Sequence, residues 1–174
     1  MITYNVFLDR ERLPAGADWA RVLRERGFET QLDPELDPKT QSGYWACPDE
    51  RTGFEYYLEP FDAPTPEMGE EGAKLIGKRN AVVSLRFSGR PPDREAASSA
   101  AATLAAMSDG ILFDSEPGHF ISATDALAWA RNERYRPIAV ARRRWNRRRA
   151  RLTAPVIVRI LIILVLAAMI VWLL

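Results

Sequence analysis

The last twenty residues, Pro155 to Leu174, constrain this chain more than any other feature, because they are apolar at every position except Arg159. At about 1.5 Å per residue they form a helix of roughly 30 Å, which matches the hydrocarbon core of a bilayer. In lipid, only a helix satisfies all backbone groups of a single segment. The sequence therefore predicts one transmembrane helix over residues 154–174. The alternative is an apolar helix in the core of a soluble protein or an oligomer.

Arg159 is the only charged residue in this segment. An arginine costs about 2.5–3.5 kcal/mol at the centre of a bilayer, and less near the ends, where its side chain reaches the headgroups. Arg159 lies near the inner end, and each leucine, isoleucine or valine returns about a few tenths of a kcal/mol. Insertion is therefore favoured, with Trp172 at the far interface.

A basic cluster precedes the apolar segment and indicates its orientation. Positive residues beside a span remain in the cytoplasm, so we expect the N-terminal part to lie on the cytoplasmic side of the inner membrane. The cluster also suits a surface of anionic lipid headgroups. Such stretches bind RNA or DNA as well, but the adjacent anchor already accounts for the charge, and nucleic acid is the less favoured partner. The cluster comprises Arg142, Arg143, Arg144, Trp145, Arg147, Arg148, Arg149 and Arg151.

The distribution of charge separates the same two parts of the chain. Residues 1–130 hold 22 acidic and 13 basic side chains, a net charge of −9, whereas residues 131–174 hold 11 arginines and one glutamate, a net charge of +10. Such a split indicates regions with different physical roles. We expect a cytoplasmic domain over residues 1–136, a basic juxtamembrane connector over residues 137–153 and a tail anchor over residues 154–174.

Periodicity predicts that residues 1–136 form a small α+β domain. Helical spacing predicts helices over residues 17–26 and 93–107, and a third helix follows Ser122-x-x-Asp125, which resembles a capping box. Residues 61–79 show no period and are predicted to be a long loop. Strands are predicted over residues 3–9, 28–32, 43–47, 54–60, 80–87, 111–113 and 119–121. This order, β-α-β, a hairpin and β-α-β, predicts a ferredoxin-like (split β-α-β) sheet with the two main helices on one face.

The domain offers one cysteine, Cys47, and one histidine, His119. A zinc site of cysteine and histidine ligands needs three or four of them, so this chain cannot supply one. Cys47 is predicted to be a small buried hydrophobe, and His119 to be an exposed turn residue. A nucleophilic pair of Cys47 and His119 is the alternative. We predict no catalytic residue, metal or cofactor.

One motif resembles a phosphate-binding P-loop. Gly72-Ala-Lys-Leu-Ile-Gly77-Lys78-Arg79 fits the spacing G-x-x-x-x-G-K, but the next residue should be serine or threonine in order to hold Mg²⁺, and here it is Arg79. A P-loop also follows a strand and opens a helix, whereas a strand is predicted after this motif. We therefore interpret it as a chance match.

Two groups of side chains are candidates for a partner surface. The alternating acids in residues 33–38 are typical of a solvated face. The alternative is a surface that binds a basic partner. The densest aromatic group is typical of a core, but rings that face solvent would anchor a partner. The candidate surface comprises Trp45, Tyr56, Tyr57, Asp33, Glu35 and Asp37.

These features predict a single-pass, tail-anchored protein whose cytoplasmic domain binds another protein at the inner membrane face. Tethering raises the effective concentration of the domain near its target. The layout is similar to that of small membrane-anchored bacterial proteins, including some immunity proteins that neutralise secreted toxins, although no motif here assigns the chain to such a family.

Two other functions remain open. A membrane-tethered enzyme would hold a small molecule between the sheet and residues 61–79, with polar groups such as Glu55, Tyr57, Arg86 and His119 turned inward. A structural protein would self-associate through its anchor, where Ala167 and Ala168 form a small patch.

Overall fold

The computed structural model describes residues 1–47, 51–65, 68–132 and 139–140. The chain divides into two units, Met1–Arg142 and Arg143–Leu174, and the fold below is that of the first unit. The predicted connector and the predicted anchor lie outside the described residues, apart from Ala139 and Val140. None of the helices formed by the described residues is both long and apolar enough to cross a membrane.

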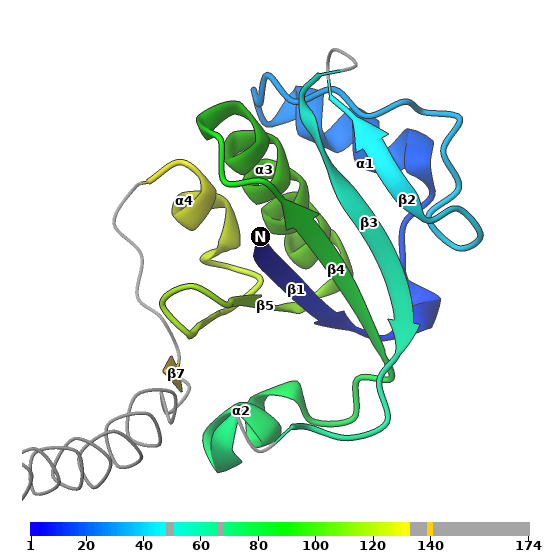
Figure 1. The fold of residues 1–174 in the computed structure, drawn as a ribbon. Coiled ribbons are helices and arrows are strands. Elements are labelled where there is room, and N and C mark those ends of the chain that lie inside the picture. Colours follow the sequence, from blue (N-terminus) through cyan, green and yellow to red (C-terminus); the bar gives the residue numbers. More distant parts are fainter. Residues whose placement is uncertain (48–50, 66–67, 133–138, 141–174) are drawn as a thin grey trace, which may run out of the picture. The chain divides into compact units, whose positions relative to one another are not determined.

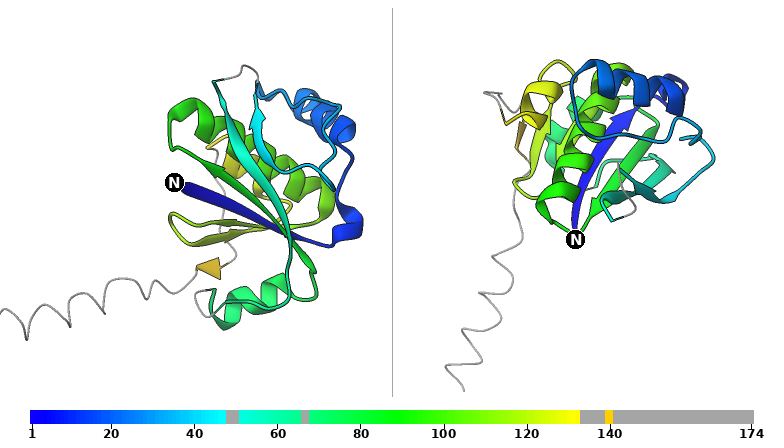
Figure 2. Two further views of the ribbon diagram at one scale, coloured as in Figure 1. Left: turned by 45° about the vertical axis from the view of Figure 1, so that its right-hand side comes forward. Right: turned by 90° about the horizontal axis from the view of Figure 1, so that it is seen from above.

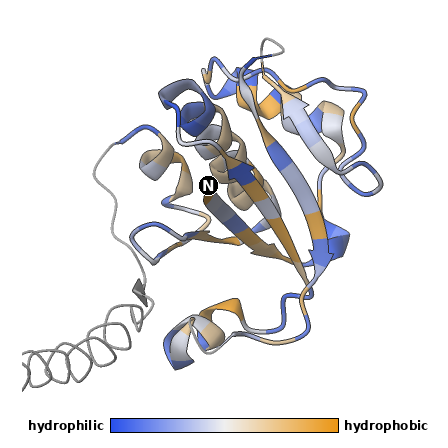
Figure 3. Cartoon of the chain, viewed as in Figure 1, coloured by the Kyte–Doolittle hydropathy of each residue, from blue (hydrophilic) through white to orange (hydrophobic). Residues whose placement is uncertain are grey.

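The described residues form one antiparallel sheet with strand order β2-β3-β4-β1-β5-β6-β7 (Figure 1). The central strands are rich in apolar residues, as Figure 3 shows for β1 and β4. The strands are β1 (Ile2–Leu8), β2 (Gly43–Ala46), β3 (Gly53–Pro60), β4 (Ala81–Phe87), β5 (Ile111–Asp114), β6 (His119–Ile121) and β7 (Ala139–Val140). The helices are the short 3-10 helix η1 (Arg10–Arg12) and α1 (Gly16–Glu25), α2 (Gly69–Ile76), α3 (Pro91–Ser108) and α4 (Ala126–Ala130).

Two β-α-β segments interleave at the centre of the sheet. Strand β4 lies between β1 and β3, and β1 lies between β4 and β5. Helix α1 connects β1 to the hairpin of β2 and β3, and α3 connects β4 to β5. The strands that each long helix joins are therefore separated by a strand from the other segment. This arrangement makes every pairing antiparallel and gives the α+β class that the sequence predicts.

Helices α1, α3 and α4 lie on one face of the sheet (Figures 1 and 2). Alternate residues of β1, namely Tyr4, Val6 and Leu8, point into the core on this side and are buried. Helix α3 is buried almost all round, because the sheet, α1 and α4 surround it. Its alanines and serines suit this position, since small side chains let neighbouring elements approach closely.

The opposite face of the sheet is covered over only part of its area. Helix α2 and Phe61 lie against the ends of β1 and β4 there. They close a second apolar cluster around the buried residues Phe7, Ile76, Ile111 and Phe120. The rest of this face carries polar side chains and is described below.

Two of the predicted elements are wrong. Residues 28–32 form no strand, although Thr30 and Leu32 are buried. They belong to the long connection between α1 and β2, in which the Thr30 hydroxyl bonds to that of Ser99 of α3 at 2.6 Å. Residues 61–79, predicted to be a loop, contain α2. The short helix was missed because three glycines in residues 69–77 obscure its periodicity.

The other predicted elements of the domain are confirmed. The hairpin of β2 and β3, strand β4, helix α3 and the hairpin of β5 and β6 lie where the sequence places them. Gly27 follows α1 with a φ of +76°, as expected for a helix stop. Ser122 accepts a hydrogen bond from the backbone of Asp125 at 3.2 Å, but this contact lies in the turn before α4, whose N-cap is Asp125 and not Ser122 as the capping box predicts.

Candidate functional site

The uncovered part of the second sheet face carries polar side chains on neighbouring strands. Register places Thr3 of β1 opposite Arg86 of β4, and Arg86 opposite Glu55 of β3. The next row on the same face contains Asn5, Ser84 and Tyr57. These residues alternate along each strand with core residues, so they point away from α1 and α3. We call this set the polar sheet face: Thr3, Asn5, Glu55, Tyr57, Ser84 and Arg86.

Side chains of the polar sheet face contact one another across the strands. The guanidinium of Arg86 lies over the ring of Tyr57, with its carbon 4.8 Å from the ring centroid. The Tyr57 hydroxyl donates to Glu55 Oε2 at 3.4 Å. The Ser84 hydroxyl donates to Asn5 Oδ1 at 2.8 Å. Tyr44, opposite Glu55 on the edge strand β2, is 54% exposed and extends the face.

The enzyme alternative expects a small-molecule pocket between the sheet and residues 61–79. The part of the sheet under this segment is filled by the apolar cluster of Phe7, Ile76, Ile111 and Phe120. Glu55, Tyr57 and Arg86 do share a face, beyond that cluster. His119 does not join them, because it pairs with Asp114 on the side of the sheet that α3 covers. Of the four polar groups named for an enzyme pocket, Glu55, Tyr57 and Arg86 therefore lie together on an open face, and His119 lies apart from them.

The candidate partner surface divides into core residues, one sheet residue and a turn. Trp45 is 3% exposed and Tyr56 is fully buried; they stack at 4.1 Å between ring centroids, and the Tyr56 hydroxyl donates to the carbonyl of Pro38 at 2.7 Å. Burial raises the pKa of Tyr56. These two rings belong to the core, so they are not a partner surface. Tyr57 alone of the three rings lies half-buried on the polar sheet face.

Asp33, Glu35 and Asp37 are exposed, and two of them shape the loop in which they lie. Asp33 accepts a hydrogen bond from the backbone of Glu35 at 2.9 Å, and Asp37 accepts one from the backbone of Lys39 at 3.0 Å. The bond from the Lys39 backbone and one from the Thr40 hydroxyl lower the pKa of Asp37. These aspartates therefore have a local structural role, as is typical of turns.

Cys47 and His119 are too far apart to act together. Cys47 follows β2 and His119 begins β6, so β3, β4, β1 and β5 lie between them. Five strand spacings of about 4.8 Å correspond to roughly 24 Å. Cys47 is fully buried, as predicted, and burial raises the pKa of its thiol to about 12. It is a core residue rather than a nucleophile.

The P-loop resemblance is a chance match, as predicted. Gly72 lies inside α2, where a Cβ atom would come within 2.6 Å of the ring of Phe120. Gly77 ends that helix with a φ of +62°. Arg79 donates to the carbonyls of Leu75 and Ile76, each at 3.0 Å. The motif therefore serves to pack and cap a short helix.

Arg79 also lines a shallow polar recess of about 230 Å³, together with Asp9, Arg12, Lys78, Ser108 and Asp109. The C-terminal ends of α2 and α3 meet in this recess, and Arg79 donates to the Asp109 carbonyl at 2.8 Å. Arg12 forms an ion pair with the Asp109 carboxylate at 3.2 Å. Both cations thus neutralise the negative ends of helices, which is a structural role.

Sequence reasoning missed a polar cluster at the other end of the sheet. Asp114 and Tyr4 are 7% and 2% exposed, and Arg94, which pairs with Glu116 at 3.0 Å, lies beside them. Burial raises the pKa of Asp114, and it raises that of Tyr4 to about 12. Asp114 accepts a bond from the Glu116 backbone at 3.0 Å, so the cluster fixes the turn between β5 and β6. The sequence could have revealed this cluster, because Asp114 lies two residues after the inward-facing Leu112 and therefore points to the same side of the strand.

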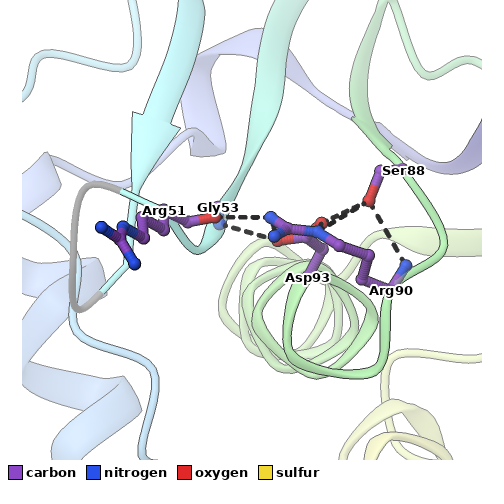
Figure 4. Close-up of polar contacts among 5 residues, drawn as sticks. All are labelled: Arg51, Gly53, Ser88, Arg90 and Asp93. Carbon is purple, nitrogen blue, oxygen red and sulfur yellow. Dashed lines mark hydrogen bonds and ion pairs between the residues drawn. The ribbon is translucent and has the colours of Figure 1, made fainter.

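A second network joins the β2–β3 turn to the start of α3 (Figure 4). Asp93 is 2% exposed, and its carboxylate accepts two hydrogen bonds from the Arg90 guanidinium, at 2.8 and 2.9 Å. It also accepts bonds from the Gly53 backbone, at 3.2 Å, and from the Ser88 hydroxyl. Arg90 in turn donates to the carbonyl of Arg51.

Burial acts to raise the pKa of Asp93, but the bonds from Arg90, Ser88 and Gly53 outweigh it and hold the pKa below its ordinary value. The groups that donate hydrogen bonds to this carboxylate all belong to the domain itself, so these bonds stabilise the fold. We call Arg90, Asp93, Ser88 and Gly53 the Asp93 clamp, and its role is structural.

Comparisons with protein-family models, curated proteins and solved structures found no match to this chain. The described residues contain no group of three or more histidine, cysteine, aspartate or glutamate side chains placed to hold a metal ion. The polar sheet face is therefore the candidate site, and it is a surface rather than a pocket.

Proposed function

We propose that this protein is a tail-anchored, single-pass protein of the cytoplasmic membrane, whose N-terminal domain binds a partner protein at the inner membrane face. The observation that carries the proposal is the apolar segment from Pro155 to Leu174 with the arginine cluster before it. A segment of this length and composition is typical of a transmembrane helix. The arginines favour a cytoplasmic domain and contact with anionic headgroups.

The interleaved strand order of the domain supports a ferredoxin-like (split β-α-β) description of its central four strands. The hairpin partner β2 extends one edge of that unit, and β6 and β7 extend the other. Helices α1, α3 and α4 lie on one face, and α2 covers part of the second. The described elements leave the remainder of the second face open.

The polar sheet face supports the binding role. Tyrosine and arginine are the side chains that most often anchor protein interfaces, and Tyr44, Tyr57 and Arg86 lie on or beside this surface. Its residues belong to neighbouring strands, so their positions are fixed before a partner arrives. Binding to such a surface costs little conformational entropy.

Site-specific photo-crosslinking in cells tests this function. A photoreactive phenylalanine analogue at Tyr57 should give a discrete crosslinked product with another protein in the membrane fraction. The same analogue at Glu25, an exposed residue of α1 on the helical side of the domain, is the matched control and should not. Equal products from both positions, or none from Tyr57, would contradict the assignment of the polar sheet face.

A further inference from the structure

Arg86 is a half-buried arginine whose N–H groups have no acceptor among the described residues. Within the parts of the chain that the structure describes, its guanidinium forms neither an ion pair nor a hydrogen bond, and its contact is with the ring of Tyr57. Other arginines close to the sheet use their donors: Arg94 binds Glu116, Arg79 binds carbonyls and Arg90 binds Asp93. Arg86 has five N–H groups to offer on an uncovered face.

The geometry around Arg86 prepares it for a planar acceptor. The contact with Tyr57, 4.8 Å from the guanidinium carbon to the ring centroid, holds the guanidinium over the ring before any ligand arrives. Strand β4 lies near the middle of the sheet, between β3 and β1, so the backbone beneath the side chain is held on both sides. A planar fork of donors matches the two oxygens of a carboxylate.

The charges around Arg86 select among acidic ligands. Glu55 lies directly opposite Arg86 in the register and accepts a hydrogen bond from Tyr57, so a negative charge borders the site. Residues 1–130 carry a net charge of −9. Both features repel polyanions such as nucleic acid or an anionic lipid surface, whereas one carboxylate on a neutral or basic protein meets little repulsion.

We propose that Arg86, stacked on Tyr57, binds a single carboxylate side chain of a neutral or basic partner protein docked on the polar sheet face. This inference rests on the proposed function, because it takes the polar sheet face as the binding surface. It adds the chemistry of the contact: a glutamate or aspartate of the partner accepts two hydrogen bonds from the guanidinium. Glu55 beside it accepts a donor or cation from the same partner.

Nuclear magnetic resonance of the arginine side chains tests this chemistry without knowledge of the partner. The full-length chain, labelled with ¹⁵N-arginine in a nonionic detergent at low salt, is titrated with N-acetylglutamate N-methylamide. The matched probe is N-acetylglutamine N-methylamide, which has the same shape without the charge. Arg86→Lys assigns the Arg86 Nε–H signal by removing it, and the Arg94 signal is the internal control.

We expect the glutamate probe to shift the Arg86 signal saturably, with an affinity at least about tenfold above that of the glutamine probe. The Arg94 signal should remain in place because Glu116 already occupies that guanidinium. Three results would overturn the proposal: no shift, equal shifts with both probes, or a larger shift with inorganic phosphate at the same concentration.

Crosslinking separates this inference from the function on which it rests. If Tyr57 captures a partner and Arg86→Gln leaves the yield unchanged, the binding surface stands and the role of Arg86 is wrong. If Arg86→Gln lowers the yield at least about tenfold, the Arg86 contact is supported. If the glutamate probe binds but Tyr57 captures nothing in cells, the carboxylate chemistry stands and the proposed function fails.

Discussion

Arg86 and Arg90 lie four residues apart, and they use the same chemical group in opposite ways. Arg90 places its guanidinium on the buried Asp93 and on the carbonyl of Arg51, so its donors are consumed within the fold. Arg86 lies over the ring of Tyr57, and its N–H groups have no acceptor among the residues that the structure describes. An arginine near a sheet therefore stabilises the domain when its donors are used internally, and is available to a partner when they are not.

The largest effect should follow from removal of the Asp93 carboxylate. Asp93→Ala leaves the Gly53 backbone donor without its partner, and it frees the β2–β3 turn from α3. We expect a loss of about 2–3 kcal/mol in the free energy of unfolding, measured by denaturant titration of the full-length chain in detergent with tryptophan fluorescence. Glu25→Ala, which breaks an exposed pair with Arg21, is the control and should cost less than about 0.5 kcal/mol.

Arg90 should have a smaller effect than Asp93, because its side chain is 56% exposed and solvent screens its charge. Arg90→Gln is expected to cost about 1–2 kcal/mol in the same titration, since Asp93 keeps its bonds from Ser88 and Gly53. Arg90→Lys should fall between the wild type and Arg90→Gln, because lysine retains the charge but not the fork. A loss as large as that of Asp93→Ala would mean that Arg90 alone carries the clamp.

The two buried aspartates should give opposite dependences on pH. The pKa of Asp93 is lowered in the folded state, so its contribution to stability is complete above the unfolded value of about 3.9 and is lost as the pH falls through the folded-state pKa. Burial raises the pKa of Asp114, so stability falls as the pH rises from about 3.9 through the folded-state pKa.

Unfolding titrations between pH 3 and pH 7 check this contrast. Asp93→Asn should weaken the loss of stability on the acid side. Asp114→Asn keeps an oxygen for the Glu116 backbone and should raise stability at neutral pH relative to the wild type. If both variants changed the free energy of unfolding at neutral pH in the same direction, the burial of Asp114 or the hydrogen bonds of Asp93 would be wrongly assigned.

Arg86 should have the smallest effect on folding. Arg86→Gln removes the contact with Tyr57, which is worth about 0.5–1 kcal/mol at a partly exposed site, and breaks no hydrogen bond among the described residues. The variant should therefore unfold within about 1 kcal/mol of the wild type. A loss of stability comparable to that of Arg90→Gln would mean that Arg86, like Arg90, stabilises the fold, and that the two arginines do not differ in role.

The sequence predicted most of the elements because their periodicity is strong. Alternation in β1 and β4, the paired strands of the hairpin and the proline start of α3 are local signals, and the structure confirms these elements. Helix α2 was missed since its glycines are needed to approach Phe120 and to end the helix, and glycine weakens any local signal of helix. Residues 28–32 alternate like a strand because Thr30 and Leu32 are buried while Glu29 and Gln31 are exposed, although the segment does not join the sheet.

The candidate site was less predictable, because it depends on register. Glu55, Tyr57 and Arg86 were recognised as polar residues on strands, but the pairing of β3 with β4 decides that they adjoin. The same pairing places Tyr56 in the core beside Tyr57 on the surface. Whether an arginine finds a buried carboxylate, as Arg90 does, depends on contacts between segments distant in sequence, such as Gly53 and Asp93.

If lipid surrounds the apolar C-terminal segment, the intact chain should fractionate with membranes. Full-length protein and a chain ending at Thr153 would be expressed in bacterial cells, and their membranes washed with carbonate. We expect the full-length protein to stay with the membrane until detergent is added, and the shortened chain to remain in the supernatant. Full-length protein recovered from the supernatant as a monomer would contradict the anchor, the orientation and the tethering together.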